Sequence, residues 1–228
     1  VTGANSGLGL ATVEALANRQ ATVILACRSS SKAEAAQQQL QDQGLSGLEL
    51  LDLDLADLSS VQRAAESVRD RYGHLDLLIN NAGVMAPPRR TTIQGHELQF
   101  GVNHLGHQAL TQALLPLMEH RPDARVVTVT SGAQYFGQIH WNDPNWEQRY
   151  ERYGAYGQSK LANVMFALEL DARLRQRNST IRSLAAHPGL ARTQLQPTAI
   201  ASGGNGVEAL AYRLMDPLFQ SAAMGALP

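Results

Sequence analysis

Short apolar runs rich in Val, Ile and Leu recur along the chain and predict its strands. Five runs have strand length and share this composition: residues 21–27, 48–53, 75–79, 125–129 and 180–186. Their apolar character is nearly continuous rather than alternating, which is typical of parallel strands covered on both faces.

Longer segments with helical spacing separate these runs. One apolar stripe consists of Leu8, Val13, Leu16 and Ala17, and a second consists of Val61, Ala64, Ala65 and Val68 after an expected helix cap at Asp57 or Ser59. Strand–helix alternation predicts an α/β fold with three layers, doubly wound, in which helices flank a mostly or wholly parallel sheet. Ligands of such folds bind at the carboxyl ends of the strands, so candidate chemistry is sought there.

Composition narrows the function classes. The 228 residues carry 19 basic and 20 acidic side chains, so no basic surface for nucleic acid is expected. A single Cys excludes a disulfide framework and a zinc site built on several thiolates, and no metal-binding histidine spacing is present. We expect a cytoplasmic protein, because one Cys suits a reducing compartment and no secretory signal is visible.

Neither repeats nor linker-like segments divide the sequence, so residues 1–228 are expected to form one domain. The longest uncharged stretch, residues 98–118, contains Asn103, His104 and His107 and cannot span a membrane.

A glycine-rich segment follows the first residue of the chain and leads into the first expected helix. Its candidate cofactor-binding residues are Gly3, Asn5, Ser6, Gly7, Leu8 and Gly9. Glycines let the backbone approach a pyrophosphate, and the N-terminus of the following helix offers free N–H groups and a positive dipole. A flexible turn would carry the same glycines, so this motif alone is suggestive only.

The end of the run at residues 21–27 bears on the choice of dinucleotide. An NAD site usually places an acidic residue there, whereas an NADP site places an Arg against the 2′-phosphate. Here Arg28 follows Cys27, and the next four residues include no acid. The sequence therefore predicts NADP(H) rather than NAD, with Arg28 as the phosphate partner, although a solvated arginine at a helix entry would look the same.

A tyrosine and a lysine form the strongest candidate for catalysis. Lys160 is one of two lysines in the chain and lies four residues after Tyr156 in a helical pattern, so both share one helix face. A free phenol is a poor proton carrier at neutral pH, and a neighbouring ammonium should lower its pKa. Ser131 follows the run at residues 125–129, where its hydroxyl could polarise a substrate oxygen.

Together these residues resemble the short-chain dehydrogenase/reductase family, a group of Rossmann-fold enzymes. The resemblance extends over nearly the whole chain and rests on ordered motifs: the Thr2–Gly9 loop, Asp54-Leu55, Asn80–Gly83, Asn103, Ser131, Tyr156-x-x-x-Lys160, and Pro188-Gly189 followed by Thr193. Singly, several of these residues could be turn, cap or strand-end residues. Jointly they are highly specific.

The resemblance implies roles for the matching residues. It implies a catalytic tetrad of Tyr156 as general acid/base, Lys160 on the nicotinamide ribose, Ser131 on the substrate oxygen, and Asn103 holding a water. It also implies cofactor contacts from Asp54, Leu55, Asn81, Ala82 and Gly83 on the adenosine side, and from Pro188, Gly189 and Thr193 beside the nicotinamide. The implied activity is hydride transfer between NADP(H) and an alcohol or carbonyl compound.

A narrower similarity is to the retinol dehydrogenases, the WW-domain oxidoreductase-like proteins and the protochlorophyllide reductase relatives. It rests on residues 25–28, 53–56, 103–107 and 159–163, and on the long separation of Ser131 from Tyr156. That interval carries six aromatic residues, which indicate either a lipophilic substrate pocket or a surface loop held by its own aromatics. Residues 190–219 are a candidate lid.

Two other functions stay open. A sensor or scaffold could keep the NADP site without catalysis, although the intact tetrad counts against it. A nucleotide-sugar epimerase or dehydratase would need more residues after Thr193 for its substrate domain.

The resemblance also implies homodimers or homotetramers. Val1 supplies only the end of a strand, and residues 225–228 resemble the start of the family helix that precedes a final strand. We therefore expect this domain to lack the start of its first strand and its last strand.

Overall fold

The structure is a computed structural model that describes residues 1–189, 191, 195–204 and 219–226. Its strands all pair in parallel, and they lie at the five apolar runs: β1 (Val23–Cys27), β2 (Leu48–Asp52), β3 (Leu77–Asn80), β4 (Arg125–Val129) and β5 (Arg182–Ala186). The predicted parallel α/β fold is therefore confirmed for the described residues.

The first three residues join two groups of strands into one layer. β1 pairs with β2, and β4 lies between β3 and β5. On one side of Val1–Gly3, Ala26 N donates to Val1 O at 3.0 Å and Gly3 N donates to Ala26 O at 2.9 Å; on the other side, Thr2 N donates to Ile79 O at 3.0 Å. The order is thus β2, β1, Val1–Gly3, β3, β4 and β5, a doubly wound arrangement with its switch point beside Thr2.

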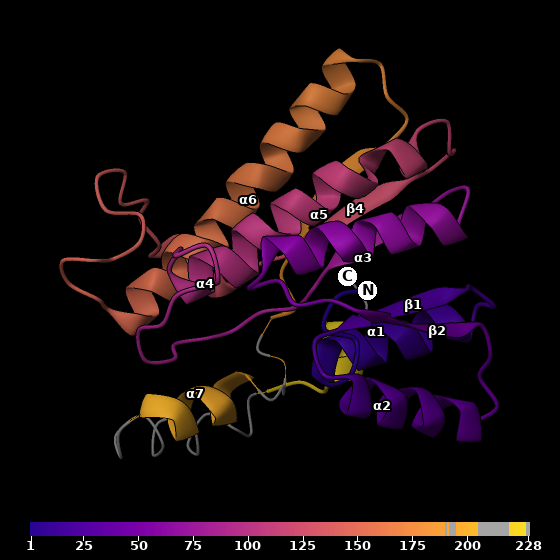
Figure 1. Ribbon diagram of the computed structural model, residues 1–228, viewed down its shortest axis with the longest axis horizontal. Helices are drawn as coiled ribbons and strands as arrows, with labels where there is room; N and C mark the ends of the chain where they lie inside the picture. The colour runs from indigo at the N-terminus through magenta and orange to yellow at the C-terminus, as the bar shows by residue number, and fades with distance from the viewer. Residues whose placement is uncertain (190, 192–194, 205–218, 227–228) are drawn as a thin grey trace.

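Helices cover both faces of this layer. In the described residues they are α1 (Gly7–Ala17), α2 (Ser30–Asp42), α3 (Leu58–Arg71), α4 (Leu98–Phe100), a π-helical turn η1 (Gly101–Leu105), α5 (Gly106–Leu114), the 3₁₀ turns η2 (Leu115–Met118) and η3 (Gly132–Tyr135), α6 (Arg152–Gln176), α7 (Leu195–Gly203) and α9 (Ala222–Gly225). Figure 1 shows α3, α5 and α6 side by side, with α1 and α2 on the other side of β1 and β2. No helix among the described residues has the length and apolarity needed to cross a membrane.

The core consists of two hydrophobic clusters, one on each side of the sheet. Val13, Leu25 and Leu40 are fully buried between α1, β1 and α2. A larger cluster fills the space between the sheet and the layer of α3, α5 and α6, with Val126 and Ile181 at 0% exposure. Asp57, one of the two expected caps, accepts a hydrogen bond from Ser59 N at the start of α3. These layers leave the carboxyl ends of β1, β3 and β4 gathered at one edge.

The contact between α5 and the segment after β2 has no space for a side chain at Gly106. A Cβ atom there would lie 2.6 Å from the main-chain oxygen of Leu55. We expect Gly106→Ala to lower the free energy of unfolding by about 1–3 kcal/mol, because a backbone clash exceeds the gain in helix propensity. Gly73→Ala is the control, since a Cβ at Gly73 would meet nothing within 4 Å. Equal urea midpoints for the two variants would contradict this packing.

Candidate active site

The glycine-rich loop between Val1 and α1 is built from closely packed backbone. Gly3 and Gly7 have φ of +63° and +52°, which favour glycine, and a Cβ on Gly9 would lie 2.3 Å from Gly3 O. Ser6 is the N-cap of α1, but its side chain makes no capping hydrogen bond. The first-turn N–H groups of α1 can therefore bind an anion. Such unpaired N–H groups beside close-packed glycines suit a pyrophosphate.

Thr2 ties this loop to the end of β3. The Thr2 hydroxyl accepts hydrogen bonds from Asn81 N and Ala82 N, both at 2.9 Å, and Asn81 Nδ2 donates to Thr2 O at 2.8 Å. A Cβ on Gly3 would lie 2.9 Å from the Ala82 Cα. The two predicted cofactor segments, residues 3–9 and 81–83, are thus in direct contact.

The remaining predicted residues on the adenosine side flank this loop. Arg28 is exposed directly after β1. Asp54 lies after β2, where its Oδ1 accepts from Ala56 N at 2.9 Å, and Leu55 is buried beside it. Both positions lie at the carboxyl ends of strands, as expected, and the exposed guanidinium of Arg28 can reach a charged group in solvent.

Asn103 lies inside the π-helical turn η1 rather than at a helix start. It is fully buried; its Oδ1 accepts from Val84 N at 2.8 Å, and its Nδ2 donates to Val84 O and to Ser159 Oγ, each at 2.9 Å. A Cβ on Gly83 would lie 3.2 Å from Asn103 Oδ1 and 3.7 Å from Lys160 Nζ. The predicted Asn103, Gly83 and Lys160 therefore face one another.

Ser131, Tyr156 and Lys160 come together at the carboxyl end of β4. Tyr156 and Lys160 are 6% and 3% exposed on α6, and the Lys160 Nζ lies 5.7 Å from the centroid of the Tyr156 ring. Lys160 Nζ donates to Val129 O at 3.2 Å. Ser131 Oγ accepts from Ala133 N at 3.3 Å and caps η3, and its hydroxyl is near enough to the Tyr156 phenol to affect the phenol's pKa. The structure thus gathers the predicted tetrad beside the carboxyl end of β4, with Asn103, Tyr156 and Lys160 buried.

Burial dominates the electrostatics of this group. It raises the pKa of Tyr156 above its usual value of 10.0, and the hydrogen bond from Ser131 offsets part of that rise. Burial lowers the pKa of Lys160 from 10.5 to about 8. The expected lowering of the Tyr156 pKa by the ammonium is therefore not the dominant effect here, since desolvation of the phenolate outweighs it.

Pro188 and Gly189, two of the predicted nicotinamide contacts, follow β5. Gly189 has φ of +65°, and Gln220 Nε2 donates to Pro188 O at 2.6 Å. Thr193 lies outside the described residues, as does much of the candidate lid. Of that lid, the structure describes α7 and the segment around Phe219.

The aromatic interval between Ser131 and Tyr156 divides into two parts. Trp146 is buried against His140 and Tyr150, with ring centroids 4.2 and 6.5 Å away, so it anchors the interval. In contrast, exposed large apolar side chains belong to Tyr135, Phe136 and Trp141. The buried Trp146 fits a surface loop held by its own aromatic residues, whereas a lipophilic substrate pocket stays a prediction.

Two residues of the site were missed from the sequence. His107 lies one helical turn after Asn103, and its Nδ1 is 3.0 Å from Asn103 O. Arg152 lies one turn before Tyr156; it donates to Ala86 O at 2.6 Å, to Ala199 O at 2.7 Å and to Gly203 O. Four-residue spacing from a predicted catalytic residue was the available signal for both.

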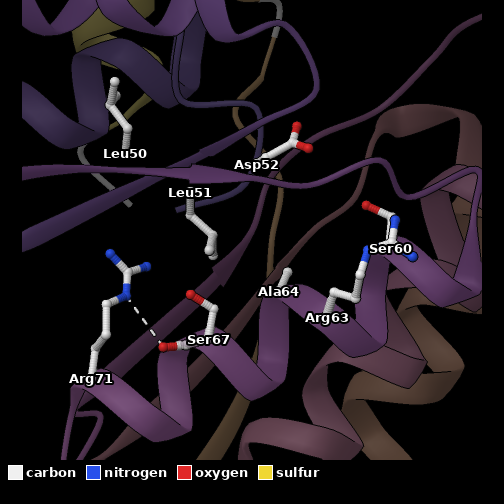
Figure 2. Close-up of a pocket in the computed structure, with 8 residues that line it drawn as sticks. All are labelled: Leu50, Leu51, Asp52, Ser60, Arg63, Ala64, Ser67 and Arg71. Carbon is white, nitrogen blue, oxygen red and sulfur yellow. Dashed lines mark hydrogen bonds between the residues drawn. The ribbon is translucent and has the colours of Figure 1, made fainter.

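The structure also contains a cavity of about 330 Å³ away from this group, between β2 and α3. Figure 2 shows Arg63 and Arg71 at its rim, with Arg71 Nε donating to the Ser67 main-chain oxygen. None of the predicted site residues lines it. Nor do the described residues contain a cluster of three His, Cys, Asp or Glu side chains suited to a metal ion.

A family model described as short chain dehydrogenase matches residues 1–202. The chain belongs to the short-chain dehydrogenase family. It is 44% identical over 197 residues to human retinol dehydrogenase 13, covering 86% of this chain and 59% of that protein. It is 40% identical over 227 residues to human retinol dehydrogenase 12, covering 99% of this chain and 69% of that protein. The chain thus spans about three fifths of the length of the first of these relatives.

Two solved structures illustrate the shared fold. A crystal structure of an uncharacterised protein from Mycobacterium paratuberculosis is 47% identical, with a TM-score of 0.76 over 92% of this chain and 74% of that one. A short-chain dehydrogenase from Sphingobium yanoikuyae in complex with NADPH is 21% identical, with a TM-score of 0.75 over 99% of this chain and 79% of that one. The second likeness supports the fold alone.

Burial of the charged Lys160 side chain lowers the free energy of unfolding, and an apolar residue at this position should remove that loss. Because its folded pKa of about 8 lies below the ordinary 10.5, the unfolded chain binds more protons between these values. The cost is therefore complete below about pH 8 and shrinks as the pH rises toward 10.5. We expect Lys160→Met to be more stable than the wild type by about 1–3 kcal/mol near neutral pH, and by less at about pH 10.

Urea unfolding at the two pH values measures this difference. Lys32→Met, at an exposed position on α2, is the matched control and should change stability little at either pH. A Lys160→Met variant that is less stable than the wild type near neutral pH would show that the hydrogen bond to Val129 outweighs the desolvation.

Proposed function

We propose that this protein is an NADP(H)-dependent oxidoreductase that interconverts an alcohol and a carbonyl group of a lipophilic substrate. The observation that carries the proposal is the grouping of Tyr156 and Lys160, both buried on α6, with Ser131 at the carboxyl end of β4. Gly83 lies next to Lys160, and residues 81–83 are in direct contact with the glycine-rich loop. A proton donor and a dinucleotide cradle thus share one edge of the sheet.

The residues present fit a nicotinamide dinucleotide. The close backbone approach at Gly3 and Gly9, together with the open first turn of α1, suits a pyrophosphate, and Arg28 suits a 2′-phosphate. When bound, the cofactor supplies or accepts a hydride. The relatives support this choice only at family level, since solved neighbours hold NAD or NADP.

The protein's part in the reaction is to move one proton and to hold the substrate oxygen. In reduction, the carbonyl carbon receives a hydride and its oxygen receives the proton of the Tyr156 hydroxyl; oxidation reverses both transfers. Ser131 donates a hydrogen bond to the same oxygen, which stabilises the charge that develops on it. Lys160 lies beside the phenol and stabilises its anionic form after proton loss.

A lipophilic substrate is favoured by two features. The exposed apolar side chains of Tyr135, Phe136 and Trp141 belong to the interval that begins at Ser131. The retinol dehydrogenases that this chain resembles are named for an apolar alcohol. The alternative is a catalytically idle NADP-binding sensor or scaffold; the complete tetrad argues against it.

Replacing Tyr156 tests the mechanism. We expect Tyr156→Phe to lower turnover of apolar aldehydes by about 10²–10⁴-fold, because the proton donor is lost, while NADPH affinity stays nearly unchanged. Absorbance of the reduced nicotinamide measures turnover, and protein fluorescence measures binding. Tyr72→Phe is the control, since Tyr72 bonds to Glu49 away from the site. Unaltered turnover in Tyr156→Phe would refute the mechanism, and NADPH binding without turnover in the wild type would favour the sensor.

Replacing Arg28 tests the choice of cofactor. We expect Arg28→Ala to weaken NADPH binding by about ten- to a hundredfold and to leave NADH binding nearly unchanged, because only NADPH carries the 2′-phosphate. Arg69→Ala, an exposed arginine at the far end of α3, controls for general loss of positive charge. Fluorescence titration with both nucleotides gives the ratio. If the wild type binds NADH as tightly as NADPH, the assignment to NADP(H) is wrong.

A further inference from the structure

The hydrogen bonds around the Thr2 hydroxyl determine where its proton points. Two main-chain donors, Asn81 N and Ala82 N, lie 2.9 Å from Thr2 Oγ1 and occupy both of its lone pairs. The remaining neighbours are His107 Nε2 at 2.8 Å and Ile79 O at 3.4 Å. The nearer atom takes the single hydroxyl proton, so His107 Nε2 acts as an acceptor and carries no hydrogen.

The protonation of the other ring nitrogen of His107, Nδ1, then follows. A neutral imidazole without hydrogen on Nε2 carries it on Nδ1. His107 Nδ1 lies 3.0 Å from Asn103 O, to which it can only donate. His107 is 1% exposed, and burial lowers its pKa to about 4, with Lys160 and His104 adding a smaller effect of the same sign. One neutral tautomer therefore satisfies both neighbours.

This tautomer links two parts of the proposed active site. On one side Thr2 opens the glycine-rich loop and receives the main chain that follows β3. On the other side Asn103 holds Val84 and Ser159 through its side chain, so its backbone position sets where those contacts lie. His107 connects the dinucleotide cradle to the buried group on α6.

We propose that His107 is a positioning residue that joins the cofactor loop to the Asn103 turn through Thr2 Oγ1–H···Nε2 and Nδ1–H···O=C of Asn103. This proposal rests on the proposed function, in which the loop binds NADP(H) and Asn103 belongs to the reacting group. Its two hydrogen bonds have separate tasks: the bond to Thr2 orders the loop for the cofactor, and the bond to Asn103 orders the turn for proton transfer.

The tautomer is tested directly on the wild-type protein, without any activity assay. The chain has seven histidines, and nitrogen-15 NMR of histidine-labelled protein reports which ring nitrogen carries hydrogen. The signals missing from a His107→Gln sample identify His107. We expect hydrogen on Nδ1 and none on Nε2 near neutral pH. The opposite tautomer, or a doubly protonated ring, would overturn the proposal whatever the enzyme does.

Two substitutions separate the two hydrogen bonds. Asn at position 107 places its amide near the Nδ1 position and keeps a donor for Asn103, whereas Gln reaches farther and keeps an acceptor for Thr2. We expect His107→Asn to weaken NADPH binding about tenfold with turnover at saturating cofactor within about threefold of the wild type. We expect His107→Gln to do the reverse, lowering turnover about tenfold and leaving NADPH binding within about threefold.

Thr2→Ser and Thr2→Val complete the experiment. The serine variant keeps the hydroxyl and should bind NADPH like the wild type, whereas the valine variant should weaken binding about tenfold, and His107→Asn should add little further loss to it. Equal losses of binding and turnover in both His107 variants, or no loss in either, would show that His107 only fills space. If the wild type has no turnover, the proposed function fails, while the NMR result and the binding data still decide the role of His107.

Discussion

The main-chain hydrogen bonds of Val1–Gly3 hold the molecule's two groups of strands in one layer. They reach Ala26 on one side and Ile79 on the other, so three consecutive residues set the spacing between β1 and β3. That spacing brings the loop before α1 against the loop after β3, with no space for side chains at Gly3 and Gly9. The proposed cofactor cradle therefore depends on the continuity of the sheet.

The proposed catalytic residues Tyr156 and Lys160 lower the stability of the fold that holds them. Lys160 and Tyr156 are buried on α6, and burial disfavours the charged form of each. Apolar residues packed at these positions would make the folded protein more stable. Active sites commonly carry such a cost, because a poised proton carrier needs a surrounding that a stable core would exclude.

Much of this arrangement could be predicted from the sequence, since the signals are local. The run at residues 125–129 coincides with β4, and Tyr156 and Lys160 share a helix face because four-residue spacing requires it. The Thr2–His107 bond could not be predicted, because it joins positions 105 residues apart through the fold. The pKa of Tyr156 was misjudged for a similar reason: the charge of Lys160 is visible in sequence, whereas the degree of burial is not.

Arg152 connects α6, which carries Tyr156 and Lys160, to two other segments of the chain. It opens α6 and reaches the loop after β3 at Ala86 and the helix α7 at Ala199 and Gly203. Each of these three bonds ends on a main-chain oxygen, which every residue type possesses. The side chains of α7 can therefore be exchanged without removing this attachment to α6.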